Sequence, residues 1–152
     1  MSEMRVKSPY SLDALLKKRR WDLDSASAET IEARMLVERC ADESRLLGES
    51  IAALEGELRS IFASGKSIDT TKHEVLGAYL SDRRKALQTK LIELRSAETE
   101  FEKRRHRLFT VKQGVMVIEK HKEGKEKEYA QHELRKEQNQ SDDLWLQRRQ
   151  DD

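Results

Sequence analysis

The chain has 152 residues and a formal net charge of +1, from 30 basic and 29 acidic residues. This near-zero balance argues against nucleic acid as a partner, because proteins that bind it usually carry a strong basic excess. Charged residues make up 39% of the chain and apolar residues only 36%, which is typical of long helices in a coiled coil, where a narrow seam is buried. Disorder is the competing interpretation of this composition.

The sequence also bears on where the protein works. It has no apolar run of about 18 residues, so we expect no membrane span. Its first residues, MSEMRVKSPYSLD, lack an apolar segment, so we expect no secretory signal. The single cysteine, Cys40, cannot form an intrachain disulfide. A reducing cytoplasm is therefore the expected compartment.

The first predicted helix spans residues 11–64, after a flexible N-terminus at 1–10. Pro9 cannot continue a helix from upstream, and Ser11 can cap the first free amides. Steps of alternately four and three residues then define a heptad seam in which twelve of fifteen positions are apolar. The seam residues are Leu12, Leu16, Arg19, Leu23, Ala26, Thr30, Ala33, Val37, Cys40, Ser44, Leu47, Ile51, Leu54, Leu58 and Ile61.

A turn is predicted at 65–71 and a second coiled-coil helix at 72–125. Gly65 suits the left-handed residue that follows a helix end, and Thr71 and Glu74 have the spacing of a capping box. Two long seams joined by a short turn pair antiparallel, so facing residue numbers sum to about 137 and the helices supercoil left-handed. Ten of thirteen second-seam positions are apolar: Leu76, Leu80, Arg83, Leu87, Lys90, Leu94, Ala97, Phe101, Arg104, Leu108, Val111, Val115 and Ile118.

Residues 126–152 are predicted to extend past the first helix. In this register residue 125 faces Leu12, so no residue of the first helix remains to pack against the residues that follow. A solitary polar helix of about 27 residues is only marginally stable in water. Leu144, Trp145 and Leu146 interrupt the polar segment, and tryptophan is enriched at binding hot spots. A solvated tail and a binding segment both remain open. The predicted fold is all-α: a long antiparallel two-helix coiled-coil hairpin with an overhanging, partly disordered C-terminal helix.

Two surface features stand out beside the seam. Five apolar residues fall on outward positions: Ile31, Met35, Phe109, Met116 and Val117. We expect them to form one exposed patch. A protein partner, a third helix or a homodimer would explain such a patch. Basic residues at 103–107 and 17–20 predict either a positive collar or ordinary solvated faces.

No motif predicts catalysis, a cofactor or a metal site, since CxxC, HExxH, a phosphate-binding loop and GxSxG are all missing from the sequence.

The ending HELRKEQNQSDDLWLQRRQ and the first helix SLDALLKKRRWDLDSA resemble the FliJ/YscO family, the central-stalk proteins of flagellar and type III secretion export. The resemblance implies a non-enzymatic bacterial protein in the cytoplasm, peripheral to the inner-membrane secretion apparatus, which promotes ATPase assembly and protein export. It implies that the termini contact the hexameric secretion ATPase, through Lys17, Arg19, Arg20, Trp145, Arg148 and Arg149.

The same resemblance implies that the tip half of the hairpin contacts the export gate, with Leu47, Tyr79 and Arg83 as candidates, and that export chaperones are further partners. Two alternatives stay open. One is a homo-oligomeric coiled-coil scaffold that associates through the apolar patch, and the other is a holdase-type chaperone or adaptor that uses its tail.

Overall fold

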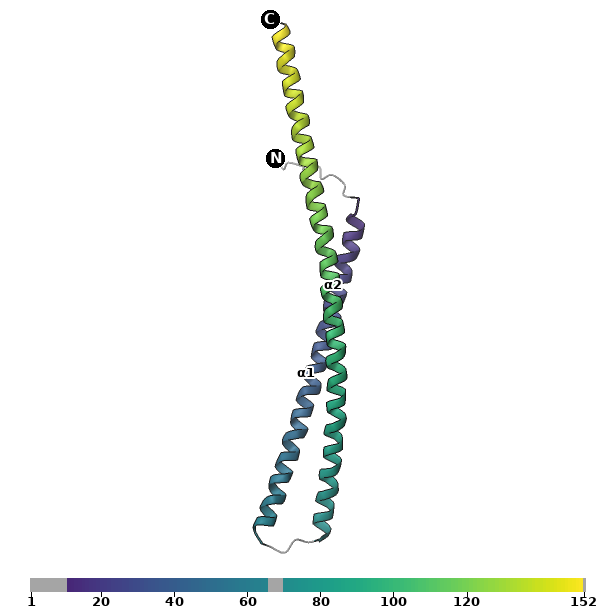
Figure 1. Cartoon of the computed structure of the whole chain (residues 1–152), viewed down its shortest axis with the longest axis vertical. Helices are drawn as coiled ribbons and strands as arrows, with labels where there is room; N and C mark the ends of the chain where they lie inside the picture. Colours follow the sequence, from purple (N-terminus) through teal and green to yellow (C-terminus); the bar gives the residue numbers. More distant parts are fainter. Residues whose placement is uncertain (1–10, 66–69, 152) are drawn as a thin grey trace, which may run out of the picture. The chain divides into compact units, whose positions relative to one another are not determined.

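The computed structural model describes residues 11–65 and 70–151, which form two long helices packed together (Figure 1). α1 spans Asp13–Ala63 and α2 spans Thr70–Gln150. The described residues contain no strand, and the predicted all-α class is confirmed. The flexible segment expected at 1–10 and most of the expected turn, residues 66–69, lie outside the described residues. In the described part of the chain, no helix has the length and apolar character needed to cross a membrane.

The helix ends follow from local sequence. At the start of α1, the amide of Leu16 donates to the carbonyl of Leu12 over 2.8 Å. At its end, the Ser64 hydroxyl donates to the carbonyl of Ile61 at 2.8 Å, and Gly65 has φ 64. This confirms the left-handed glycine, which costs no side-chain clash there. α2 begins at Thr70, one residue before the predicted cap at Thr71, a difference usual for helix boundaries.

The chain divides into two units, each built from a segment of α1 and a segment of α2. The hairpin unit comprises Ala26–Leu108 and therefore contains the turn. The terminal unit combines Met1–Ser25 with Phe109–Asp152. Each unit is described separately below.

The hairpin unit is held by a narrow core between its two helices. Four ion pairs among the described residues cross it: Glu29 pairs with Arg104 at 2.7 Å and with Arg107 at 3.2 Å, Glu43 with Lys90 at 2.6 Å, and Glu55 with Arg84 at 2.7 Å. Later residues of α1 pair with earlier residues of α2, so the helices run antiparallel. Each pair lies within about one helical turn of the predicted register. Among the described residues of this unit, the buried ones are all predicted seam positions: Ala26, Thr30, Cys40, Ser44, Ile51, Leu80 and Ala97.

The heptad seam of α2 is confirmed position by position. From Thr70 to His121 the residues that are not exposed are the thirteen predicted seam positions and Gly114. On α1, Arg19 and Ile61 are the two predicted seam positions that the structure leaves exposed. Ile61 lies in the last turn of α1, where the opposing helix offers less cover, and is 38% exposed.

The terminal unit has a smaller core, formed by Leu16 and Val115, which are 2% and 4% exposed. Ion pairs join Arg20 to Glu119 at 3.2 Å and Asp13 to Lys122 at 2.9 Å, so the two segments again run antiparallel. Helical geometry continues through Gln150. From residue 123 to 151 every residue is exposed apart from one half-buried glutamate at 133. This stretch of α2 therefore presents its side chains to solvent on all sides.

Candidate partner-contact surfaces

The C-terminal turns of α2 carry an exposed apolar group. Leu144, Trp145 and Leu146 are 59%, 59% and 52% exposed. The Arg149 guanidinium carbon lies 5.2 Å from the centre of the Trp145 ring, within the range of a cation–π contact. The pair is one helical turn apart, so the cation covers part of one indole face while the rest of the ring stays in solvent.

The α1 segment of the terminal unit contributes cations. Lys17, Arg19 and Arg20 are all exposed. Arg20 is committed to Glu119, whereas Lys17 and Arg19 have no ion-pair partner among the described residues. All six residues that the family resemblance implies for ATPase contact belong to the terminal unit.

One exposed aromatic of the terminal unit is missing from the sequence-based candidates. Trp21 is 69% exposed, the highest value among the large apolar residues of the described chain. It lies between the seam positions Arg19 and Leu23, so the helical period places it on the side of α1 opposite the seam. The same outward-position rule that selected Phe109 would have found it.

Near the turn, Arg83 and Tyr79 form a joined pair on α2. The Arg83 side chain donates to the Tyr79 hydroxyl over 2.9 Å and 2.6 Å, and its guanidinium carbon lies 4.9 Å from the tyrosine ring centre. Leu47, the third gate candidate, is a half-buried seam residue on α1, which leaves less of it for a partner.

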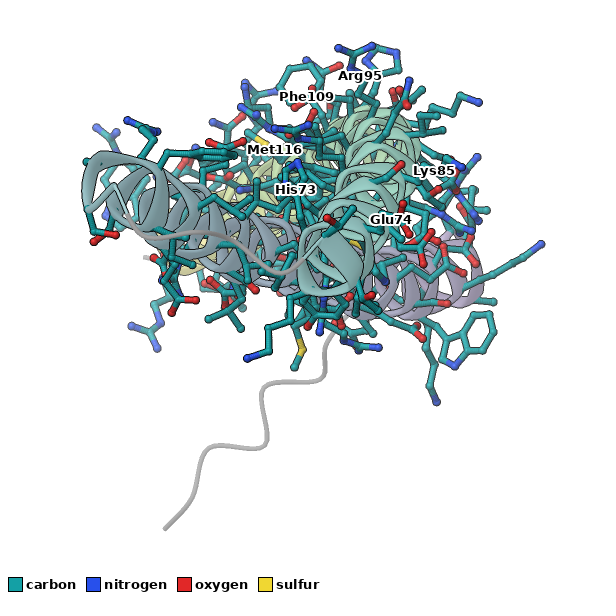
Figure 2. All side chains as sticks on the ribbon, turned by 90° about the horizontal axis from the view of Figure 1, so that it is seen from below. His73, Glu74, Lys85, Arg95, Phe109 and Met116 are labelled. Atoms are coloured by element: carbon teal, nitrogen blue, oxygen red, sulfur yellow. The ribbon has the colours of Figure 1, made fainter. Side chains whose placement is uncertain are left out.

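Two further exposed residues near the turn escaped the sequence analysis. Phe62 is 58% and Val75 63% exposed. The Phe62 ring packs edge-on against His73, with centres 5.5 Å apart and planes at 89°. His73 and its neighbour Glu74 project from the first turns of α2 in Figure 2.

The five residues of the predicted apolar patch are all exposed, by 48% to 66%. Phe109, Met116 and Val117 lie together in a groove on α2, and Phe109 and Met116 project from the same side of this helix in Figure 2. Ile31 and Met35 belong to the hairpin unit. Their union with the other three in a single patch stays a prediction.

Two polar layers interrupt the apolar seam of the hairpin unit. In one, the Thr30 hydroxyl lies 2.7 Å from the Ala26 carbonyl and 3.3 Å from that of Arg104, which in turn pairs with Glu29. In the other, Lys90 pairs with Glu43 beside the buried Ser44, fourteen residues further along α1. Among the described residues no buried side-chain polar atom lacks a partner, so these layers are fully satisfied.

The ion pair of the second layer shifts the acid–base behaviour of both partners. The hydrogen bond from Lys90 lowers the pKa of Glu43, and the same bond, together with one to Glu93, raises the pKa of Lys90. A carboxylate whose pKa is lower in the folded state stabilises the fold above its unfolded pKa, near 4.5, and loses that contribution as the pH falls through its folded pKa.

We therefore expect the free energy of unfolding of the wild-type protein to fall more steeply below about pH 4.5 than that of Glu43→Gln. Urea unfolding between pH 3 and pH 7, followed by circular dichroism, measures both curves, and the other carboxylates act alike in the two proteins. Curves that stay parallel across this range would show that Glu43 is not held by Lys90 in solution.

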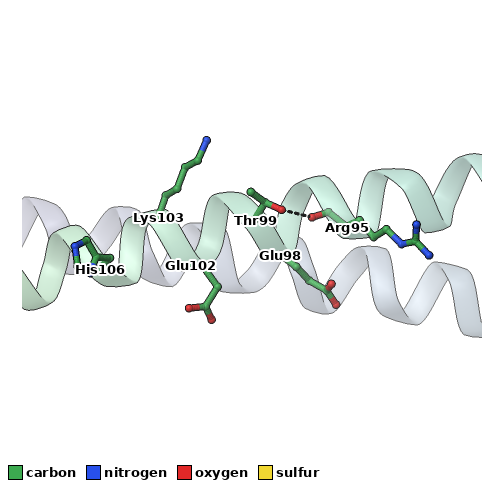
Figure 3. Close-up of a pocket in the computed structure, with 6 residues that line it drawn as sticks. All are labelled: Arg95, Glu98, Thr99, Glu102, Lys103 and His106. Atoms are coloured by element: carbon green, nitrogen blue, oxygen red, sulfur yellow. Dashed lines mark hydrogen bonds between the residues drawn. The ribbon is translucent and has the colours of Figure 1, made fainter.

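A second groove, on the α2 face of the hairpin unit, carries mainly charged residues: Arg95, Glu98, Thr99, Glu102, Lys103 and His106. The Thr99 hydroxyl donates to the carbonyl of Arg95 at 2.9 Å. Figure 3 shows the side chains spread along the helix and pointing in different directions, without a common point. No group of three or more metal-ligating side chains occurs in the ranges that the structure describes. This face is a charged surface that offers exposed groups to solvent or a partner.

Two long packed helices with heptad seams and highly charged outer faces define a coiled-coil-like helical protein. The chain belongs to the FliJ family, because the family model described as flagellar FliJ protein matches residues 8–151. Comparison with curated proteins and with solved structures gives no match. The chain is therefore a component of a flagellar or type III export apparatus, in which this family supplies a non-catalytic stalk component on the cytoplasmic side.

Proposed function

We propose that this protein is a stalk that contacts the hexameric type III secretion ATPase through its terminal unit and the export gate through the turn end of its hairpin unit. In this role it promotes assembly and activity of the ATPase, and with it protein export. The observation that carries the proposal is the exposed triplet Leu144, Trp145 and Leu146 on a segment that has no seam of its own.

The position of this triplet supports an overhanging helix. Lys122 pairs with Asp13, which is the first residue of α1. Residues of α2 beyond this pair have no further turn of α1 to pack on, and from residue 123 to 151 all of them except Glu133 are exposed. We infer that the segment after residue 125 extends beyond α1 and is held in place by a partner.

The arrangement of the triplet indicates the shape of that partner. Consecutive residues of an α-helix are about 100° apart, so three of them cover about 200° of its circumference. A flat surface would bury one of these side chains and leave the others in water. A partner that encloses the helix, such as the pore of a ring, can contact all three and recover the hydrophobic free energy of each.

The charges of the terminal unit fit the same partner. A single stalk cannot match six identical subunits at once, so its contacts must cost similar free energy in several orientations. Lys17 has a flexible four-carbon stem, and Arg19 and Arg148 have long side chains, so their charges can reach carboxylates at several positions. Trp21 adds an exposed aromatic anchor to this unit.

For the gate, we propose the surface close to the turn. Tyr79 and Arg83 present a hydroxyl and a guanidinium on one face of α2. Phe62 and Val75 add exposed apolar area nearer the turn, more than Leu47 can offer from the seam. A partner with an apolar cleft and an acidic rim suits this combination.

The test is hydrolysis by the cognate export ATPase, measured with the intact chain and with a chain that ends at Gln140. We expect the intact chain to stimulate hydrolysis or hexamer assembly. The shortened chain should reach half-maximal stimulation only at a concentration on the order of tenfold higher, because it lacks Trp145, a residue type enriched at binding hot spots.

The matched control keeps the full length. Trp145→Ser should reproduce most of the loss, whereas Ile92→Ser, at an equally exposed apolar site of the hairpin unit, should stimulate as the intact chain does. Equal stimulation by the intact chain, the shortened chain and Trp145→Ser would remove the C-terminal helix from the proposed contact.

A further inference from the structure

The outer face of α2 in the terminal unit carries an apolar groove that neither the ATPase nor the gate proposal uses. A hollow of about 620 Å³ that opens to solvent lies between its side chains. Three apolar and three polar side chains line it: Phe109, Lys112, Gln113, Met116, Val117 and Lys120. All of them come from one helix, at spacings of three, four and seven residues, so they form one continuous face.

The coiled coil itself does not call for apolar residues on this face. Phe109, Met116 and Val117 are 58%, 48% and 66% exposed, so they contribute little to the seam. Fourteen residues earlier, at the same heptad positions, α2 carries Arg95, Glu102 and Lys103. Two heptads restore the helical phase closely, and charged residues are therefore compatible with these positions. The apolar residues at 109, 116 and 117 expose area that water solvates poorly.

The charge around the groove is one-sided. Lys112 and Lys120 flank Met116 by one helical turn on either side, and neither has an ion-pair partner among the residues that the structure describes. The nearest carboxylates along the helix are already committed, Glu119 to Arg20 and Glu123 to Lys127. The groove thus combines an apolar floor with two cations that are free to pair.

We propose that this groove binds an amphipathic helix of another protein, one whose apolar stripe is flanked by Asp or Glu. The apolar residues of such a helix, spaced three, four and seven apart, would lie on Phe109, Met116 and Val117. Its carboxylates would pair with Lys112 and Lys120, which fixes orientation and excludes helices with basic flanks.

Charge also decides against a second copy of this chain as the occupant. A twofold contact uses the same face on both subunits, and with antiparallel helices centred on Met116 it sets Lys112 of one chain against Lys120 of the other. Like charges across an interface oppose association. A helix of another protein with acidic flanks contacts the same apolar residues, and its carboxylates attract Lys112 and Lys120 where a second copy would repel them.

The proposal is tested with the full chain and two labelled synthetic helices of about 20 residues. Both carry the same leucine stripe, and one has glutamate and the other lysine at the flanking positions. We expect fluorescence anisotropy to show binding of the glutamate peptide alone, weakened on the order of tenfold by Val117→Glu. Ile92→Glu is the matched control, with a similarly exposed aliphatic side chain on α2, and should leave binding unchanged.

Reversing the charge of the two lysines gives the decisive experiment. The double variant Lys112→Glu, Lys120→Glu should lose the glutamate peptide and gain the lysine peptide, an outcome that mere unfolding would not produce. Failure of the intact chain to bind the glutamate peptide, or equal binding of both peptides, would overturn the proposal. So would sedimentation that shows a stable homodimer abolished by Val117→Glu, because the occupant would then be a second copy.

Discussion

Replacing Gly48, Gly56 and Gly77 with alanine is expected to raise the free energy of unfolding by about 3 kcal/mol, because each helix-interior glycine costs about 1 kcal/mol relative to alanine. All three lie inside the helices of the hairpin unit, and an added Cβ meets no atom within 4 Å at any of them. The methyl groups therefore cost no packing strain. Thermal unfolding followed by circular dichroism should show a rise in Tm of about 6–12 °C for a chain of this size.

Gly65→Ala is the matched control, and its effect should have the opposite sign. Space is open there too, but the backbone has φ 64, a conformation in which an L side chain is strained. A loss of about 1 kcal/mol is expected. If all four substitutions change stability in the same direction, the assignment of three sites to helix interiors and one to a left-handed turn is wrong.

Leu16→Ala is expected to lower the free energy of unfolding by about 2–3 kcal/mol, because it removes a fully buried side chain from the small core of the terminal unit. The adjacent Leu15→Ala makes the same chemical change at a site that is 39% exposed and should cost less than about 1 kcal/mol. Urea unfolding compares the two midpoints. Equal losses would contradict the heptad phase on which the whole seam rests.

Much of the fold could be predicted because burial in a two-helix pair depends mainly on the angular position of each residue around its helix. A period of 3.5 residues identified the buried face of α2 without reference to any distant contact. The exposure of Ile61 could not be read in this way. It depends on how closely the second helix approaches near the turn, and the heptad pattern carries no signal of that distance.

For the candidate surfaces, the sequence predicted which residues are exposed but not which side-chain contacts they make. The exposure of Trp145 and of the 109–117 face followed from polar surroundings and outward heptad positions. The cation–π contact of Arg149 and the hydroxyl contact of Arg83 depend on side-chain rotamers, which the sequence does not specify. Likewise, the sequence does not show whether Lys112 forms an ion pair, because that depends on which partner each carboxylate takes, as Glu119 takes Arg20.

We propose above that the terminal unit, and specifically the helix around Trp145, lies against the export ATPase. Site-specific photo-crosslinking in the assembled apparatus tests it most directly, with a crosslinking phenylalanine derivative placed at 145, at 79 or at the exposed control position 92. We predict adducts with the ATPase from Trp145 and with the gate protein from Tyr79, and neither adduct from Ile92. An ATPase adduct from Tyr79 or Ile92 together with none from Trp145 would contradict the account.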